Sequence, residues 1–139
     1  MDRFRSGEFA WADARQAFFE GFERSLVAYV EAGNDLIVEY IIENAAWMRR
    51  LIRRFEGHDV FFVGVHCALE ELERRERARG DRRIGDARRD FHTIHLHCLY
   101  DAELDATATP PEANADELLA LWRERRRPSA FERSAAVTP

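Results

Sequence analysis

The apolar and polar positions of the chain alternate between helical and extended patterns. Residues 6–32 repeat large apolar side chains at helical spacing and predict a long amphipathic helix. Residues 36–42 form a nearly continuous apolar, β-branched run, which is typical of a strand covered on both faces. Residues 43–55 predict a second amphipathic helix, and residues 60–66 predict another buried strand. Strand, helix and strand with short connections predict a parallel crossover and an α/β fold.

From residue 68 onward the pattern becomes strongly charged. Residues 68–99 predict two charged helices that break at Gly80 and together form a helical excursion from the sheet. Residues 102–107 predict a third short strand. Asn114 and Glu117 have the spacing of a capping box, which predicts the start of a last helix. The sequence therefore predicts about three parallel strands flanked by helices.

Length and composition agree with one globular domain. The chain has 139 residues, of which 46% are hydrophobic, and this is enough for one core. We expect an α/β domain over residues 1–127 and a loosely ordered tail over residues 128–139. No apolar run approaches the ~20 residues of a membrane-spanning helix and no signal-type segment is visible, so the expected location is the cytoplasm. The net charge of −5 gives no case for nucleic acid or an anionic membrane as partner.

All 21 basic residues are arginine, and lysine is absent from the sequence. Arginine keeps its charge and can bind phosphate or carboxylate through two parallel hydrogen bonds. Biased codon usage is a simpler explanation of this composition than selection for chemistry. In either case the sequence supplies neither a Schiff-base lysine nor a phosphate-loop lysine.

The arginines concentrate between Glu73 and Asp90, where eight arginines are interleaved with five acidic residues. One interpretation is a solvent-exposed helix pair with ion pairs between residues four apart. The other is a ligand site, because ligands of open α/β sheets bind beyond the carboxyl ends of the strands and this segment follows such an end. A nucleic-acid surface fits less well, since the acids nearly balance the arginines and no aromatic platform is interspersed.

Two further groups are candidate metal ligands. Glu39 lies in the predicted strand 36–42, where a carboxylate could hold Mg²⁺ or could be an ordinary polar residue at a strand end. His92, His95 and Cys98 are spaced three apart, but this matches no closed zinc pattern and favours partly exposed residues on a helix. We expect the other cysteine, Cys67, to be a buried structural thiol.

Several of these stretches together resemble the chloramphenicol phosphotransferase-like family of phosphate-loop kinases. The resemblance extends over residues 9–131 and rests on five stretches considered jointly. They are Gly33–Glu39 (GNDLIVE), Val60–Cys67 (VFFVGVHC), Glu70–Gly85 with its ARGDR core, His95, and Tyr100–Asp105 (YDAELD).

The resemblance implies a kinase that transfers the γ-phosphate of ATP to a hydroxyl of a small molecule, which is chloramphenicol in the namesake. It also implies Mg²⁺, a five-stranded parallel sheet, and a helical lid over residues 68–99. By the same resemblance Arg79 and Arg82 match lid arginines that reach the phosphates, and Arg75 and Glu76 match lid positions beside them. Glu39 takes the place of the acid that ends the third strand, and the loop after residues 102–107 would help to hold adenine.

The sequence also departs from the family pattern. A complete member opens with a strand, a Gly-rich loop ending in Gly-Lys-Ser/Thr, and a segment with a catalytic aspartate, and none of these is present. The expectation is therefore an N-terminally truncated phosphotransferase, inactive or incomplete as this chain, with possible self-association through unpaired strands. The alternative is a non-catalytic α/β module that binds an anionic ligand or a protein through the arginine-rich segment.

Overall fold

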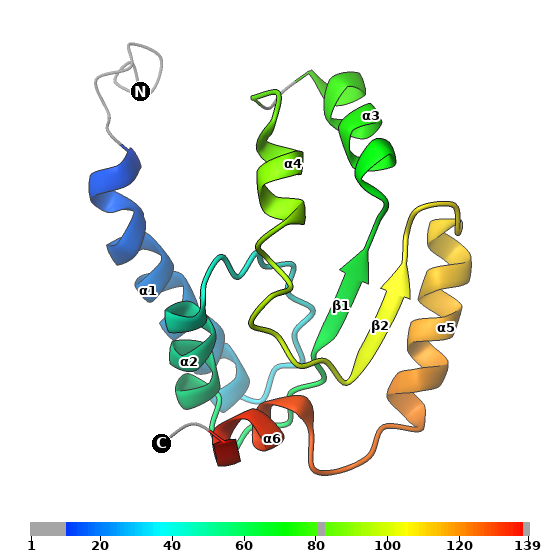
Figure 1. Ribbon diagram of the computed structural model, residues 1–139. Coiled ribbons are helices and arrows are strands. Elements are labelled where there is room, and N and C mark those ends of the chain that lie inside the picture. The colour runs from blue at the N-terminus through cyan, green and yellow to red at the C-terminus, as the bar shows by residue number, and fades with distance from the viewer. Residues whose placement is uncertain (1–10, 81–82, 138–139) are drawn as a thin grey trace. The chain divides into compact units, whose positions relative to one another are not determined.

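The computed structural model describes residues 11–80 and 83–137, and the chain divides between Glu39 and Tyr40 into two compact units (Figure 1). The first unit contains helix α1 (Trp11–Glu31). The Gly33 N–H bonds to the Val30 carbonyl at 2.8 Å, and Gly33 has a φ of 88°, a conformation that suits glycine. The predicted helix and its glycine stop are therefore confirmed in the described part of this segment.

The strand predicted over residues 36–42 is not formed. Residues 34–43 adopt neither helix nor strand. A strand persists only when a neighbour satisfies its backbone groups, and the sheet of the described chain consists of two other strands. Most apolar side chains of this run are exposed, with Ile37 fully accessible at 104% and Val38 at 41%, whereas Ile42 at its end is buried. The apolar, β-branched pattern indicates a propensity for strand, but the described residues supply no neighbouring strand with which this segment could pair.

The second unit is built around a parallel pair of strands, β1 (Val63–His66) and β2 (Ala102–Asp105). Both lie inside the strands predicted over residues 60–66 and 102–107, so an α/β fold is confirmed, with two strands instead of three. Figure 1 shows that helices α3 (Leu69–Arg79) and α4 (Asp86–Phe91) lie beyond the carboxyl ends of the strands. Helix α5 (Pro111–Arg123) lies beside β2.

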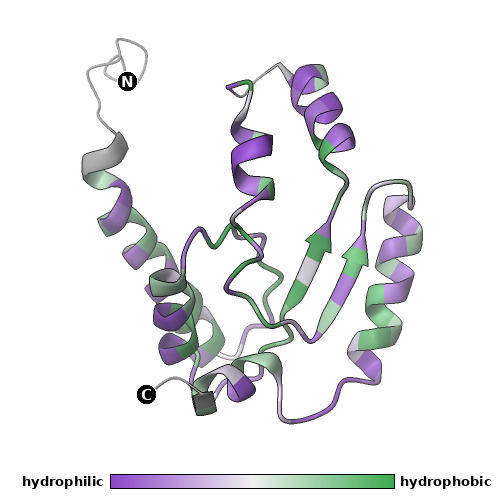
Figure 2. Ribbon diagram, in the orientation of Figure 1, coloured by the Kyte–Doolittle hydropathy of each residue, from purple (hydrophilic) through white to green (hydrophobic). Residues whose placement is uncertain are grey.

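Helix α2 (Ala45–Arg54) forms as predicted and packs against helix α6 (Ala130–Val137). The Asn44 side chain caps α2 by accepting a hydrogen bond from the Trp47 N–H at 3.0 Å. The inward face of α2 buries Trp47, Met48, Leu51 and Ile52. Figure 2 shows the contrast with α3 and α4, which are hydrophilic over most of their length.

Two predicted helix boundaries and one predicted tail need correction. Helix α4 ends at Phe91 instead of near Leu99, and the Thr93 hydroxyl donates to the Arg89 and Asp90 carbonyls, which competes with continued helical bonding. Helix α5 starts at Pro111, whose fixed φ suits a first helical position, and not after a cap at Asn114.

The third correction concerns the tail predicted to be loosely ordered, because helix α6 forms there. Ser129 and Glu132 form a capping box, in which the Ser129 N–H donates to the Glu132 carboxylate at 2.6 Å and the Glu132 N–H donates to the Ser129 hydroxyl. Ala130 and Phe131 are buried, and the Phe131 ring lies 5.3 Å from that of Phe62. The tail is thus part of the packed unit.

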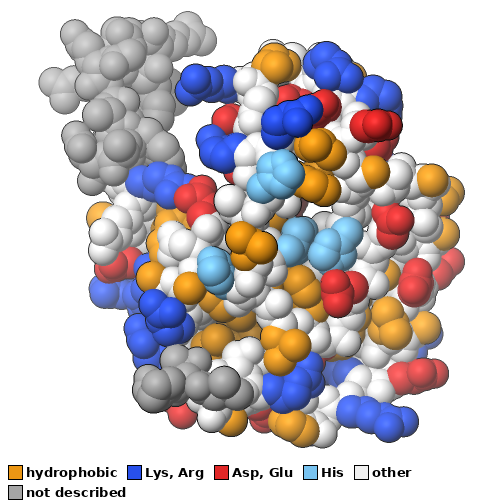
Figure 3. Space-filling view, in the orientation of Figure 1, with side chains coloured by type: hydrophobic (Ala, Val, Ile, Leu, Met, Phe, Trp, Pro, Cys, Tyr) orange, Lys and Arg blue, Asp and Glu red, His pale blue; other side chains and the backbone are white. Residues whose placement is uncertain are grey.

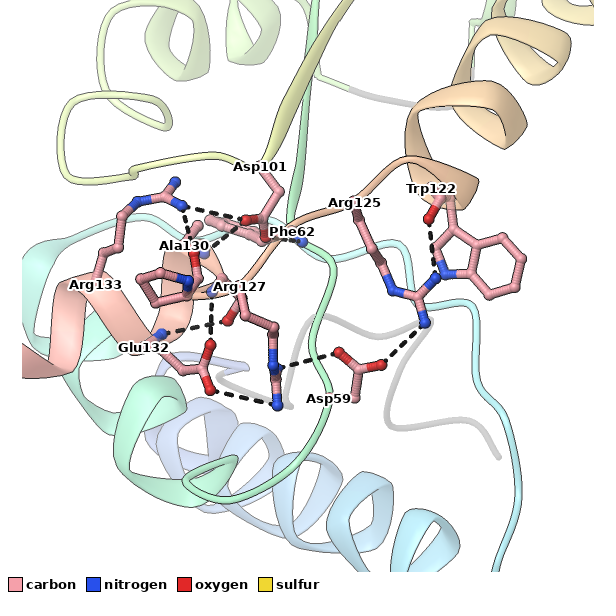
Figure 4. A network of polar contacts seen from close by, with 11 residues as sticks. Asp59, Phe62, Asp101, Trp122, Arg125, Arg127, Ala130, Glu132 and Arg133 are labelled. Carbon is pink, nitrogen blue, oxygen red and sulfur yellow. Dashed lines mark hydrogen bonds and ion pairs between the residues drawn. The ribbon is translucent and has the colours of Figure 1, made fainter.

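The Asp101 carboxylate joins β1, β2 and α6 (Figure 4). Its two oxygens accept hydrogen bonds from the Phe62 N–H at 2.9 Å and the Ala130 N–H at 2.6 Å, and its side chain is only 8% exposed. Arg133 pairs with Asp101 at 3.7 Å and donates to the Tyr100 carbonyl at 3.1 Å. Further out, Asp59 pairs with Arg125 and Arg127 at the surface.

In the described part of the chain, no helix is long and apolar enough to cross a membrane.

We predict that Asp101→Ala lowers the free energy of unfolding by about 3 kcal/mol, because it leaves two backbone N–H groups without their acceptor. Urea denaturation monitored by circular dichroism measures this change. The matched control is Asp59→Ala, which removes an exposed carboxylate of the same network and should cost about 0–1 kcal/mol. Equal losses in the two variants would contradict the structural role of Asp101.

Candidate functional site

One face of the sheet is polar near its carboxyl end. In the parallel register Gly64 lies beside Glu103, and His66 lies beside Asp105. Side chains alternate between the faces of a strand, so these four residues share one face. Ala102 and Leu104 point to the opposite side and are buried. Figure 3 shows histidine side chains gathered in the middle of one face, below a group of arginine and acidic side chains.

A chain of contacts runs across this polar face. His66 Nε2 lies 2.8 Å from a Glu103 carboxylate oxygen, and the His66 and His95 rings lie 4.1 Å apart between centroids. His95 Nδ1 lies 2.6 Å from the Tyr100 hydroxyl. The Tyr100 ring covers Gly64 so closely that a Cβ at this position would lie 2.7 Å from it, so only glycine fits there.

Burial shifts the pKa values of side chains on this polar face and next to it. Burial, together with the neighbouring His66, lowers the pKa of His95. Burial also raises the pKa of Tyr100, with a contribution from Cys98, and burial raises the pKa of the Cys98 thiol. A neutral imidazole and a neutral phenol can share a hydrogen bond in which one donates and the other accepts. These shifts make Cys98 a protonated thiol, which is a poor metal ligand.

Helix α3 is bound to the carboxyl end of β2 through Arg75. The Arg75 guanidinium donates to the Ala106 carbonyl at 2.7 Å and to the Glu71 carboxylate at 2.7 Å. Arg74 also donates to Glu71, and these two arginines lower the pKa of Glu71 to about 2. Arg75 therefore lies at the end of the sheet where ligands of α/β proteins bind.

Helices α3 and α4 are joined by a buried carboxylate and a surface ion pair. Glu76 is 7% exposed, and its oxygens accept hydrogen bonds from the N–H groups of Gly85 and Ala87, each at 2.8 Å. These backbone donors lower the pKa of Glu76. Glu73 and Arg88 form an ion pair at 2.6 Å between α3 and α4.

The predicted site residues are only partly brought together. Arg75 lies at the end of β2, and Arg79 is the exposed last residue of α3. Arg82 lies outside the described residues. Glu39 is exposed in the first unit, on the segment that forms no strand, so its role as a Mg²⁺ ligand stays a prediction.

A metal cluster is not formed by the side chains that the structure describes, because no group of three or more His, Cys, Asp or Glu residues could hold an ion. This includes His92, His95 and Cys98, whose spacing had made a site conceivable. Sequence reasoning named Glu76 only through the resemblance and missed both its bonds to backbone N–H groups and the contact between His66 and Glu103. The signal for the latter was the parallel register, which places the two strand ends side by side.

We predict that His95 makes the fold sensitive to mild acid. Because the pKa of His95 is lowered in the folded protein, the unfolded chain binds the proton more tightly. The stabilisation is fully present above the ordinary histidine pKa of about 6.5. It is lost as pH falls through the lower pKa of the folded protein. Urea denaturation at pH 7.5 and pH 5.5 measures the loss. It should be smaller in His95→Gln, which cannot titrate, than in the parent or in His97→Gln at an exposed position. An unchanged loss in His95→Gln would contradict this assignment.

Comparison with known proteins identifies the family of this chain. The family model of chloramphenicol phosphotransferase-like proteins matches residues 3–123. Two proteins from two strains of Mycobacterium tuberculosis, each named "Putative O-phosphotransferase", are 40% identical to this chain over 110 residues. The match covers 79% of this chain and 49% of each relative, so the chain spans about half the length of these relatives. No solved structure matches significantly. The chain therefore belongs to the chloramphenicol phosphotransferase-like family.

Proposed function

We propose that this chain takes part in ATP-dependent transfer of a phosphoryl group to a hydroxyl of a small molecule, and that it contributes the lid. The observation that carries the proposal is the place of the arginine-rich helices, which follow the carboxyl end of β1 directly. Arg75 ties them to the end of β2 through the Ala106 carbonyl at 2.7 Å. Family membership and the names of the two mycobacterial relatives support the reaction class.

In this proposal Arg75, Arg79 and Arg82 face the nucleotide phosphates, with Mg²⁺ as the metal and Glu39 as its candidate ligand. Charge accumulates on the oxygens of the transferred group and of the leaving phosphate, and fixed guanidinium groups stabilise it. The bond to the hydroxyl oxygen forms as the bond between the β- and γ-phosphates breaks, and the hydroxyl proton leaves to a base.

The sequence contains no lysine and no Gly-rich loop ending in Gly-Lys-Ser/Thr. Oriented donors of that kind typically contribute several orders of magnitude to phosphoryl transfer. We therefore propose that this chain by itself binds nucleotide weakly and does not turn over. The second candidate function is a non-catalytic module that binds an anionic ligand or a protein through the arginine-rich segment, which the place of this segment beyond the carboxyl end of β1 favours.

We predict that MgATP binds this chain with a dissociation constant well above the micromolar range in isothermal titration. Arg79→Ala and Arg82→Ala should weaken this binding further, because each removes a phosphate contact. The matched control is Arg53→Ala, which removes an exposed arginine of α2 away from the lid. Micromolar, Mg²⁺-dependent binding would show that the phosphate site is complete without the Gly-rich loop. Binding that is lost in Arg79→Ala but is indifferent to Mg²⁺ would favour the anion-binding module.

A further inference from the structure

His66 differs from the other histidines of this chain because it pairs with a carboxylate. Its Nε2 lies 2.8 Å from a Glu103 carboxylate oxygen, at the carboxyl end of the paired strands. In the described part of the chain, which includes all five histidines, no other histidine forms such a pair. The pair lies at the end of the sheet where ligands of α/β proteins bind.

The hydrogen bond to Glu103 determines which ring nitrogen of His66 carries the proton. An ionised carboxylate only accepts hydrogen bonds, so Nε2 is the protonated nitrogen of this pair. In a neutral imidazole the other ring nitrogen, Nδ1, then holds a lone pair. No residue that the structure describes forms a hydrogen bond with this Nδ1. His66 therefore presents a nucleophilic nitrogen on a ring that is anchored at its opposite nitrogen.

The packing around His66 leaves this lone pair accessible. The His95 ring lies over the imidazole at 4.1 Å between centroids, with 33° between the two ring planes. A stacked neighbour covers the face of a ring, whereas the lone pair of Nδ1 lies in the ring plane. The side chain of His66 is 39% exposed. A small molecule can therefore approach Nδ1 from solvent.

The surroundings of His66 suit a phosphoryl group. Helix α3 begins three residues later, at Leu69, and no side chain caps it. The first N–H groups of a helix bind phosphoryl oxygens, and the helix dipole favours negative charge there. The other carboxylate on this face of the sheet, Asp105, accepts a hydrogen bond from the Thr107 N–H at 2.8 Å and is thus directed to the loop after β2.

We propose that His66 Nδ1 is a phosphorylation site, which takes a phosphoryl group from a small donor such as phosphoramidate or an acyl phosphate, and that Glu103 is its positioning residue. This proposal does not depend on the proposed function, because it requires no nucleotide. It makes the chain itself an acceptor of the phosphoryl group, through a histidine nucleophile.

The step balances without a further reactant. The lone pair of His66 Nδ1 attacks phosphorus, so that a bond between nitrogen and phosphorus forms while the bond to the leaving group breaks. With phosphoramidate the leaving group is ammonia, which departs with the electron pair of the broken bond. The imidazole ring gains the positive charge that the ammonium group of the donor gives up. The Glu103 carboxylate stabilises this charge through the hydrogen bond to Nε2.

The test treats the full chain with potassium phosphoramidate and follows the product by mass spectrometry and by phosphorus and nitrogen NMR. We expect His66 to react at least about tenfold faster than the exposed His92 and His97, because the carboxylate partner activates its ring. We also expect the phosphoryl group on Nδ1, because Nε2 is bonded to Glu103. This fast reaction should be absent in His66→Gln.

Glu103→Gln tests the positioning role. It keeps the size of the side chain but loses its charge, and the fold should tolerate it because this side chain is 64% exposed. The rate at His66 should fall at least about tenfold, and part of the phosphoryl group should move to the released Nε2. A loss of stability alone would not change which ring nitrogen reacts. The matched control is His97→Gln, which should keep the parental rate and the parental isomer at His66.

Two results in the parent chain would overturn the proposal. One is a rate at His66 no greater than that at the exposed histidines, and the other is a phosphoryl group on Nε2 of His66. A parental rate and a parental isomer in Glu103→Gln would also overturn it, because the pair would then not direct the reaction. If circular dichroism shows that Glu103→Gln does not fold, the rate and the isomer in the parent decide.

Discussion

The second unit depends on one buried carboxylate. Strands of four residues, paired only with each other, are marginal on their own. Asp101 supplies what the short ladder lacks, because it accepts the Phe62 and Ala130 N–H groups from two segments distant in sequence. These bonds fix the amino end of the strand pair and attach α6 to it. The register at the carboxyl end, and with it the contact of His66 with Glu103, follows from that fixed start.

A second acid bonded to backbone amides lies in the helices that follow β1. Glu76 binds the start of α4 to α3, and after α4 the His95 ring lies 4.1 Å from that of His66 between centroids, with its Nδ1 2.6 Å from the Tyr100 hydroxyl. Half of the charged side chains of α3 and α4 lie between Glu76 and His95 in the sequence. A charged segment with little apolar surface cannot be ordered by burial alone, so polar anchors at both ends carry its structure.

The elements that could be predicted from the sequence are those whose pattern is local. The period of α2, the apolar runs around β1 and β2, and the break at Gly80 all depend on neighbours within a few residues. The run at residues 36–42 shows the limit, because its β-branched side chains express a propensity that only a neighbouring strand can realise. Helix α6 was missed although Ser129 and Glu132 have capping-box spacing, since the composition after Pro128 indicated a loose tail.

The bonding of Glu76 could not be predicted from the sequence for a different reason. An acid among eight arginines is expected to form one more surface ion pair, and only the family resemblance singles out this position. Its carboxylate instead accepts hydrogen bonds from the Gly85 and Ala87 N–H groups, which lie nine and eleven residues further along the chain. Such partners leave no local pattern in the sequence, because they become neighbours only when α4 packs against α3. The buried carboxylate stays ionised because these backbone donors replace its lost hydration and lower its pKa.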